Sequence, residues 1–365
     1  MKIVSIGLAV SLWFAGAGLA ADISIATIGP MSGQYETFGA QMKAGAEQAV
    51  ADINAAGGVN GKKLKLIIED DACDPSQAVV VARRLAAMKV ALIAGHLCSG
   101  ASILAAAVYA KESIVQISPA ATNPKLTDER AGPGIFRVSG RDDRQGRVAA
   151  AFMAKRYAGG KIAILHDNTA YGRGLAYETR KHLNKADHRA VMYEAYRAGA
   201  NDYSALISRM KQAAIDVAYV GGHHIEAGLI VRQMRQHGMK TQLIAGDALV
   251  TREFWQVARE AGDGTLMTFA PDPRNNPAAG DVVRKFRARK IEPEGYVLYT
   301  YAAVQAWAQA ARAAQSEASA KVIDALNTGE FSTVLGTFKF DKKGDPTLPS
   351  FKFYEWKGGR YEQID

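Results

Sequence analysis

The sequence predicts an α/β fold with two lobes, each built on a parallel sheet covered by helices. Its 365 residues suffice for two domains of ordinary size. Short apolar segments alternate with amphipathic segments from residue 22 onwards, which is typical of parallel sheets with helices on both faces. The alternation restarts after Gly140, which indicates a second unit of the same kind. A composition of 48% hydrophobic and 22% charged residues excludes the disordered and fibrous classes.

The N-terminal residues predict an export signal. A cationic start at Lys2 precedes an apolar run over residues 3–15, and small residues lead to Ala20. The run is shorter than the roughly 20 apolar residues of a membrane anchor. We therefore expect residues 1–20 to be a signal peptide cleaved after about Ala20. The mature chain is then expected to be exported, without stable membrane insertion; the resemblance described below implies the periplasm as its compartment.

The expected elements of the first lobe follow from hydrophobic periodicity and from the residues that end each segment. The strand at 22–28 alternates with period two and ends at a Gly-Pro turn. Glycines end the helix that follows, and a short apolar run marks each later strand. The expected strands are 22–28, 63–68, 90–94 and 114–117, and the expected helices are 38–55, 76–88 and 99–111.

The second lobe repeats this order, and the C-terminal region is less regular. The expected helices are 142–157, 174–185, 203–213 and 226–236, and the expected strands are 162–165, 190–194, 217–220 and 243–245. Beyond residue 271 the sequence predicts helices at 278–290 and 295–314 and short strands near 336–340 and 351–356. This region is too short for a third α/β domain, so we expect it to complete the first two.

Charge and cysteine content narrow the function classes. Lys and Arg number 45 against 36 Asp and Glu, a net charge of +9. The cations are scattered in pairs and no run reaches five like charges, which disfavours nucleic acid as a partner. In an exported protein Cys73 and Cys98 favour a disulfide over a metal pair, with two buried free thiols as the alternative.

Sequence motifs give no support to an enzyme. The sequence lacks H-E-x-x-H, G-x-S-x-G, C-x-x-C and a full Walker A motif. The segment Gly57–Lys62 is one residue short of a phosphate loop and fits a turn. Ser208 and Lys211 match S-x-x-K inside an amphipathic helix without companion motifs. His223 and His224 lack the spacing of metal ligands, so we expect no catalysis, no cofactor and no metal site.

Polar residues follow several expected strands at their carboxyl ends, where open α/β sheets bind ligands. Ser99 and Thr122 lie at expected helix starts, where their hydroxyls act either as ordinary N-caps or as donors to a carboxylate. In the second lobe Tyr171, His223 and Asp247 follow their strands, and Asp247 either pairs with a cation or closes a turn. Anion binders on one lobe facing a carboxylate on the other would suit a zwitterion in a cleft.

Eight segments resemble the periplasmic leucine/isoleucine/valine-binding proteins of ABC transporters, a type I periplasmic binding protein family. The resemblance runs from about residue 22 to the C-terminus. The segments are Gly45–Asn54, Asp70–Pro75, Gly95–Ser99, Ile117–Thr122, His166–Asp167, Tyr171–Gly172, Gly221–His223 and Thr300–Ala303. It implies two Rossmann-like lobes joined by a three-stranded hinge. The N-terminal lobe would comprise 21–140 and 271–348, and the C-terminal lobe 141–270 and 349–365.

The resemblance also implies a function and a set of site residues. The protein would capture a neutral aliphatic amino acid of the branched-chain type between its lobes and deliver it to the permease and ATPase subunits. Ser99, Thr122 and the backbone around Ala120 would hold the carboxylate first. Tyr171 and Asp247 would then close across the cleft, with Asp247 pairing the ammonium. The pocket for the ligand side chain would be lined by Phe38, Leu97, Cys98, Ala121 and Tyr296. Cys73 and Cys98 would form the family's disulfide.

Four positions depart from the branched-chain pattern. Phe38 and His223 replace tyrosines, Asp247 replaces a glutamate, and Tyr296 replaces a phenylalanine. The shorter aspartate implies an ammonium that lies deeper or is carried on a longer ligand, and one methylene changes affinity by about 1–3 kcal/mol. The same role for small amino acids or γ-aminobutyrate therefore stays open, as does a protein that presents its ligand to a sensor. We expect a monomer.

Overall fold

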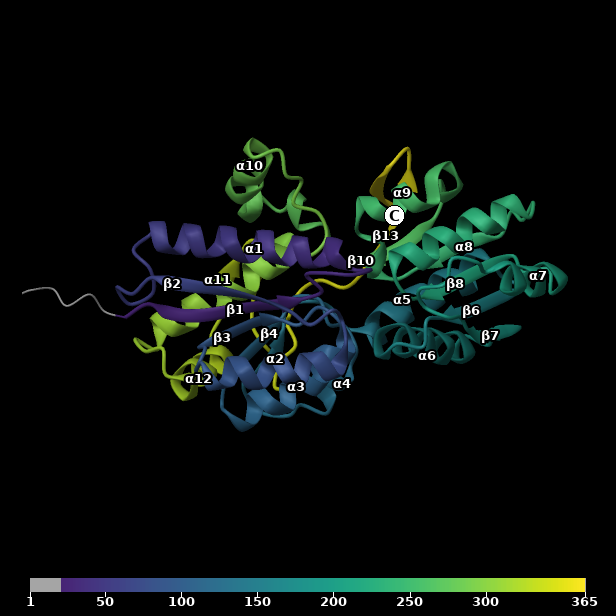
Figure 1. The fold of residues 1–365 in the computed structure, drawn as a ribbon. Helices are drawn as coiled ribbons and strands as arrows, with labels where there is room; N and C mark the ends of the chain where they lie inside the picture. The colour runs from purple at the N-terminus through teal and green to yellow at the C-terminus, as the bar shows by residue number, and fades with distance from the viewer. Residues whose placement is uncertain (1–20, 365) are drawn as a thin grey trace, which may run out of the picture.

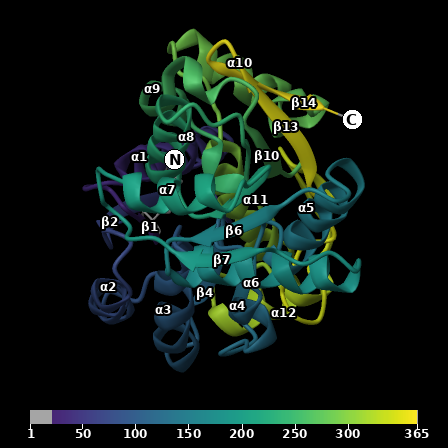
Figure 2. The same cartoon turned by 90° about the vertical axis from the view of Figure 1, so that its right-hand side faces the viewer.

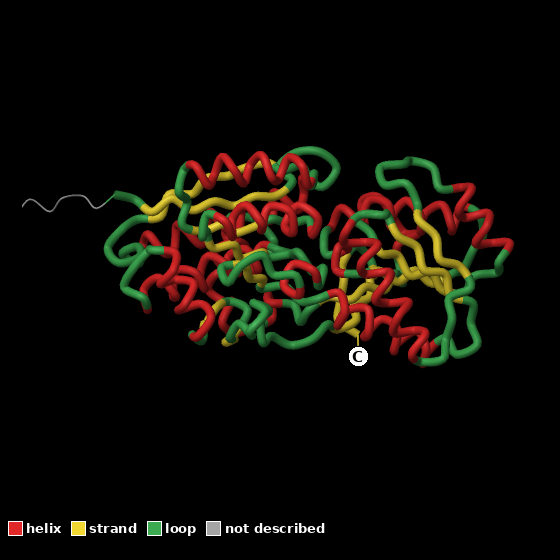
Figure 3. Tube along the Cα trace, turned by 90° about the horizontal axis from the view of Figure 1, so that it is seen from below, coloured by secondary structure: helices red, strands yellow, loops and turns green. Residues whose placement is uncertain are grey.

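Two α/β lobes lie side by side in the computed structural model, which describes residues 21–364 (Figures 1 and 3). The predicted signal peptide at 1–20 lies outside the described residues. Within residues 21–364, no helix has both the length and the apolar character needed to cross a bilayer. The predicted fold class is confirmed, because each lobe has its own sheet with helices packed on it.

The first lobe contains a five-stranded sheet in which all pairings are parallel. Successive side chains of a strand point to opposite faces, so Ile25 belongs to the core on one face and Ala26 to the core on the other. The central strands are buried on both faces, as parallel sheets require. In spatial order the strands are β2 (Leu64–Asp70), β1 (Ile23–Gly29), β3 (Leu92–Gly95), β4 (Val115–Ser118) and β5 (Ile135–Arg137).

Helices cover both faces of this sheet. Helix α1 (Glu36–Ala55) packs against α11 (Val297–Ala313) on one face, and α2 (Pro75–Ala87) packs against α3 (Ser99–Lys111) on the other. The C-terminal region therefore returns to the first lobe. The remaining elements here are α4 (Lys125–Asp128), α10 (Gly280–Ala288), α12 (Ser319–Thr328) and the hairpin of β11 (Phe331–Thr333) and β12 (Gly336–Phe338).

The second lobe contains a seven-stranded mixed sheet, seen with β6 and β7 towards the viewer in Figure 2. The last two strands are antiparallel, because they form a hairpin that adds to the edge of a parallel core. In spatial order the strands are β14 (Arg360–Ile364), β13 (Lys352–Lys357), β10 (Leu266–Phe269), β9 (Gln242–Ala245), β8 (Val217–Gly221), β6 (Ile162–His166) and β7 (Met192–Ala195). The α-helices are α5 (Asp142–Arg156), α6 (Ala170–Lys185), α7 (Ser204–Gln212), α8 (His224–Gln236) and α9 (Arg252–Ala258), and the 3-10 turns are η1 (Asp247–Leu249) and η2 (Arg259–Gly262). Two further 3-10 turns, η3 (Pro273–Asn275) and η4 (Pro277–Ala279), lie between β10 and α10 and contact α10.

Several element boundaries differ from the sequence predictions for local reasons. Helix α6 begins at Ala170 rather than 174, because the Thr169 hydroxyl accepts the Gly172 N–H at 3.0 Å and caps the helix there. Ser99 is the first residue of α3 and not its N-cap, since Cys98 holds the cap position. Thr122 starts no helix, because α4 begins at Lys125. The short elements α4, β5, β10, β11 and α9, the helix α12 and the final strand β14 were not predicted.

Three chain segments connect the lobes: 138–141, 270–277 and 339–351. The first links β5 to α5, the second follows β10, and the third links β12 to β13. The structure thus places the strands of residues 23–137 in one lobe and those of 162–269 and 352–364 in the other. The cut points proposed at residues 140, 270 and 348 stay a prediction.

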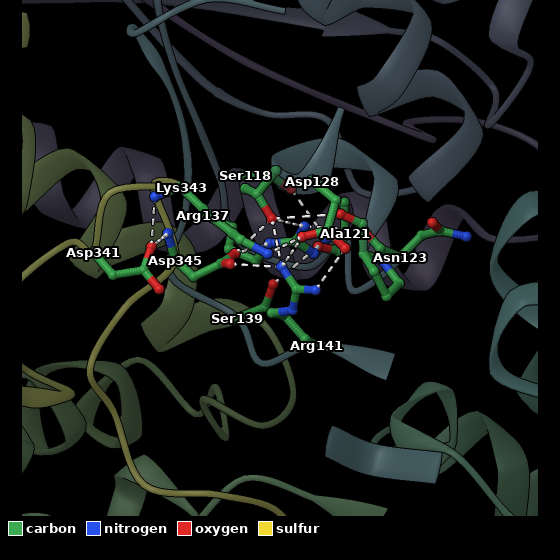
Figure 4. Close-up of polar contacts among 12 residues, drawn as sticks. Ser118, Ala121, Asn123, Asp128, Arg137, Ser139, Arg141, Asp341, Lys343 and Asp345 are labelled. Carbon is green, nitrogen blue, oxygen red and sulfur yellow. Dashed lines mark hydrogen bonds and ion pairs between the residues drawn. The ribbon is translucent and has the colours of Figure 1, made fainter. Parts of the chain in front are cut away.

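A buried ion-pair network joins the first and third connecting segments (Figure 4). The Arg137 guanidinium is fully buried and lies 2.8 Å from the Asp345 carboxylate, which also accepts from Arg141 at 2.8 Å. Burial disfavours the charge on Arg141, but hydrogen bonds to Asp143, Asp128 and Asp345 raise its pKa. The contact with Arg141 in turn lowers the pKa of Asp128 to about 2.

Replacement of Arg137 by methionine is expected to destabilise the protein strongly. The change leaves buried acceptors without their donor and the Asp345 carboxylate with one cation less, a loss of about 3–5 kcal/mol for a broken buried pair. Chemical denaturation measures it as a lower free energy of unfolding. Lys343→Met is the control, because that cation is exposed and its pair with Asp128 is worth less than about 1 kcal/mol. Equal stability of the two variants would contradict a structural role of the network.

Candidate ligand-binding site

A small cavity of about 20 Å³ lies between the two lobes. Its walls come from the carboxyl ends of strands in both sheets, where α/β proteins bind ligands. The lining residues are Phe38, Leu97, Cys98, Ser99, Ala120, Tyr171, His223, Asp247, Ala248 and Tyr296. Nine of the eleven predicted site residues are thus brought together, and Ala248 was not predicted. Ala121 and Thr122 lie behind this wall and do not line the cavity.

Ser99 presents a hydroxyl donor at the wall formed by the first lobe. It follows β3 and begins α3, so the start of the helix holds it at the edge of the sheet. Its Oγ accepts the backbone N–H of Asn123 at 3.3 Å, which leaves the hydroxyl hydrogen available for an acceptor in the cavity. A carboxylate is the acceptor that such a donor binds most strongly.

Ala121 and Thr122 belong to the loop that supports this wall. The Ala121 carbonyl accepts from Arg137 at 2.6 Å, and the Thr122 carbonyl accepts the Asp142 N–H at 2.9 Å. Both residues are buried. These bonds fix the position of Ala120 at the cavity. A direct contact of Ala121 or Thr122 with ligand stays a prediction.

Asp247 is the buried acid of the site. Its Oδ1 accepts from the Tyr171 hydroxyl at 2.8 Å and from Gln145 at 3.1 Å, and its Oδ2 accepts from the Tyr296 hydroxyl at 2.8 Å. Burial raises the pKa of Asp247, although these three donors oppose the rise. A carboxylate has about four lone-pair positions, so one on Oδ2 stays free for a further donor such as an ammonium.

Gln145 and Asp142 were missed by the sequence analysis and lie directly behind Asp247. Gln145 bridges Asp247 to the Thr268 carbonyl, each at 3.1 Å. Asp142 is fully buried, and burial together with the nearby Asp247 raises its pKa well above the usual value. Both residues lie on the buried face of α5, three positions apart. The helical periodicity of the predicted helix at 142–157 is a signal that could have identified them.

His223 contributes a second ionisable group to the cavity wall. Its ring stacks on Tyr35 at 4.2 Å between centroids, and its Nδ1 lies 3.0 Å from the Asp167 carboxylate. Burial disfavours the imidazolium, but the hydrogen bond and the charge of Asp167 outweigh it and raise the pKa of His223. The same contact lowers the pKa of Asp167 against the effect of its burial.

The neighbouring His224 points elsewhere and binds Glu253 at 2.8 Å. Among residues 21–364, no three His, Cys, Asp or Glu side chains lie close enough to hold a metal ion. The two histidines thus have separate partners.

A disulfide joins Cys73 to Cys98, with 5.4 Å between the Cα atoms. It ties the loop before α2 to the residue that caps α3. Because Cys98 lines the cavity and Ser99 follows it, the bridge holds one wall of the site to the rest of the lobe.

Hydrogen bonds across the cleft hold the lobes together in this structure. On the first lobe the bonding residues lie in α1 and in the loops before α4 and α11. On the second lobe they lie in η1, α6 and α9. The pairs are Tyr296 with Asp247 at 2.8 Å, Thr37 with Glu253 at 2.5 Å, Asn123 with the Ala170 carbonyl at 2.7 Å, and Glu294 with the Arg252 N–H at 3.0 Å. The arrangement is therefore closed over the cavity.

Comparison with known proteins agrees with this geometry. The periplasmic binding protein family matches residues 22–360. Leu/Ile/Val-binding protein homolog 1 of Brucella suis is 46% identical over 355 residues, which cover 97% of this chain and 95% of that protein. The chain belongs to the periplasmic binding protein family. This is a family of substrate-binding proteins and not of enzymes.

Solved structures of periplasmic binding proteins match both lobes. A leucine-binding protein, LivK, from Thermotoga maritima has a TM-score of 0.86 and 25% identity, covering 94% of this chain and 98% of its own. The branched-chain amino acid transporter substrate-binding protein LivJ from Streptococcus pneumoniae, in complex with isoleucine, has a TM-score of 0.85 and 27% identity. That match covers 94% of this chain and 99% of the other.

Reduction of the Cys73–Cys98 disulfide is expected to lower the free energy of unfolding by about 3–4 kcal/mol in the chain-entropy estimate. The bridge spans 25 residues, so its loss enlarges the unfolded ensemble. Denaturation with and without a reductant measures the change, and alkylation followed by mass spectrometry reports the number of free thiols. Two alkylated thiols in unreduced protein would contradict the disulfide.

The raised pKa of His223 predicts a stability that depends on pH. A group whose pKa is higher in the folded state stabilises that state fully below its unfolded pKa of about 6.5 and loses the contribution as pH rises through the folded pKa. We therefore expect His223→Gln to lose stability relative to wild type below about pH 6.5, and the difference to shrink at higher pH. Thermal denaturation across pH measures this, with His237→Gln, outside the site, as control. A difference independent of pH would overturn the assignment.

Proposed function

We propose that this chain is the periplasmic substrate-binding component of an amino-acid ABC transporter. It would capture a neutral aliphatic amino acid of the branched-chain type in the interlobe cleft and deliver it to the permease and ATPase subunits. Residues 1–20 would be removed during export, and the mature protein would be located in the periplasm. It would act as a monomer. The observation that supports this most directly is a buried carboxylate, Asp247, with a free acceptor position in the same cavity as the Ser99 hydroxyl.

The two lobes supply the complementary halves of a zwitterion site. Asp247 and Tyr171 from the second lobe would receive the ammonium, and Ser99 with the backbone at Ala120 would receive the carboxylate. A protonated ammonium beside Asp247 offsets the desolvation that raises the pKa of this acid. Leu97 and Phe38 supply apolar surface for the ligand side chain.

Closure would follow from contacts that the ligand makes with both lobes at once. In an open arrangement the first lobe presents Ser99, and the ligand carboxylate binds there. The ammonium then attracts Asp247 as the lobes close, so the ligand stabilises only the closed state. The hydrogen bond from the Tyr296 hydroxyl to Asp247 joins the two lobes and would also stabilise the closed state.

A smaller ligand in the same role, including γ-aminobutyrate, is the alternative. The Phe38 and Tyr296 rings both line the cavity and pack edge to face, with 5.6 Å between their centroids, so they occupy part of the apolar wall. A thermal-shift screen of amino acids and γ-aminobutyrate ranks the candidates, because the tightest ligand raises the melting temperature most at equal concentration.

Asp247→Asn is expected to weaken amino-acid binding by about 3–5 kcal/mol, or more than about a hundredfold, with little change of shape. The substitution removes the charge that pairs with a desolvated ammonium. Calorimetric titration with the best ligand of the screen measures the effect. Asp281→Asn, a highly exposed site on α10, is the control and should bind as wild type does. Near wild-type affinity of Asp247→Asn would overturn the proposed ammonium site.

A further inference from the structure

A second and larger cavity of about 420 Å³ lies at the hinge. Its walls include residues from all three connecting segments, at 138–141, 270–277 and 345–351. Tyr299 and Leu335 from the first lobe and Arg144 and Gln363 from the second complete it. It shares no lining residue with the cavity between the lobes. The hinge cavity is therefore a separate space whose shape depends on how the lobes are oriented.

Among residues 21–364, the charged groups of the hinge cavity leave one cation, Arg144, without an ion-pair partner. The carboxylates of the cavity are both occupied, since Asp272 pairs with Arg274 and Asp345 with Arg137 and Arg141. Arg144 is different, because its guanidinium forms no ion pair or hydrogen bond with any residue from 21 to 364. It is half-buried and lies in the first turn of α5, where the helix dipole disfavours a cation. An anion beside Arg144 would offset both effects.

The uncharged part of the lining combines apolar residues with five polar ones, Ser139, Asn275, Asn276, Ser350 and Gln363. Five prolines lie along the connecting segments, together with Leu335, Leu348 and Phe351. Tyr299 adds an aromatic wall and a hydroxyl for which no residue from 21 to 364 supplies a hydrogen bond. Concave pockets that combine apolar walls with placed polar groups are typical of small-molecule sites.

We propose that the hinge cavity binds a small carboxylic acid with an apolar body, whose carboxylate pairs with Arg144. The apolar body lies against the prolines of the connecting segments. This site is distinct from the proposed amino-acid site and needs no ammonium on its ligand, because both lining carboxylates already have arginine partners.

Occupancy of the hinge cavity is coupled to closure of the cleft. The connecting segments that form its walls change their relative positions when the lobes rotate, and the cavity described here belongs to the closed arrangement. Helix α11 also links the two spaces, because Tyr296 precedes its first turn in the cleft and Tyr299 lines the hinge cavity, with ring centroids 6.3 Å apart. A ligand that fits this arrangement stabilises it, so amino-acid affinity rises, and the effect is reciprocal.

The first test uses 4-phenylbutyrate as the probe, with its primary amide as the neutral match. Ligand-observed NMR and calorimetry on wild type are expected to give a dissociation constant of about 1 mM for the acid, in the range of a weak fragment. The amide and Arg144→Gln should each reduce binding at least about tenfold. Arg147→Gln is the control, since this residue is exposed on the same helix and does not line the cavity. Absence of binding to wild type, or equal binding by Arg144→Gln, overturns the site.

The second test measures coupling and rests on the proposed amino-acid function. Saturating 4-phenylbutyrate is expected to tighten binding of the best amino acid about fivefold, within the usual range of allosteric coupling. Arg144→Gln should abolish this enhancement and leave amino-acid affinity without probe unchanged. Competition between probe and amino acid would place the probe in the cleft and overturn the proposal. Unchanged amino-acid affinity at saturation would refute the coupling. Failure of amino-acid binding itself would count only against the proposed function, since the first test needs no amino acid.

Discussion

The buried contact between Arg137 and Asp345 is the interaction on which both the hinge and the site depend. Arg137 ends β5 and donates to the Ala121 and Asn123 carbonyls, which shape the loop that carries Ala120 to the cavity. Its pair with Asp345 anchors the third connecting segment to the first. Desolvation of this arginine is costly and lowers its pKa. The cost is offset because one guanidinium satisfies carbonyls that would otherwise be buried without donors.

In the cavity between the lobes, too, hydrogen bonds offset the desolvation of a buried charged group. Asp247 is buried, and hydrogen bonds from Tyr171, Gln145 and Tyr296 replace most of its water. Donors fixed on three different elements hold the carboxylate in one orientation before any ligand arrives. Since one of these donors belongs to the opposite lobe, the charge of Asp247 and the closure of the cleft are linked. The site is thus preorganised for a single added donor.

Hydrophobic periodicity accounted for most of the fold, because each long element buries a regular stripe or face. It failed where order comes from single polar contacts: the Thr169 cap extends α6, and the seven residues of α9 are too few to show a period. The carboxyl ends of the strands indicated Ser99, Tyr171, His223 and Asp247, and the resemblance added the other predicted residues that line the cavity. Neither argument identified Gln145 or Asp142, which lie behind the cavity wall. Both residues interact with Asp247, which is more than a hundred positions away in the sequence and comes close only in the folded chain.

Two departures from the branched-chain pattern compensate each other in the folded site. Asp247 is one methylene shorter than the glutamate it replaces, and Tyr296 is one hydroxyl longer than the phenylalanine it replaces. The added hydroxyl donates to the shorter carboxylate at 2.8 Å, so the Oδ2 atom keeps a donor across the cleft. A phenylalanine at 296 would leave Oδ2 of this aspartate without its only hydrogen-bond donor among residues 21–364. We therefore expect the two residues to act together on ligand choice, because loss of the Tyr296 hydroxyl also removes a donor from Asp247.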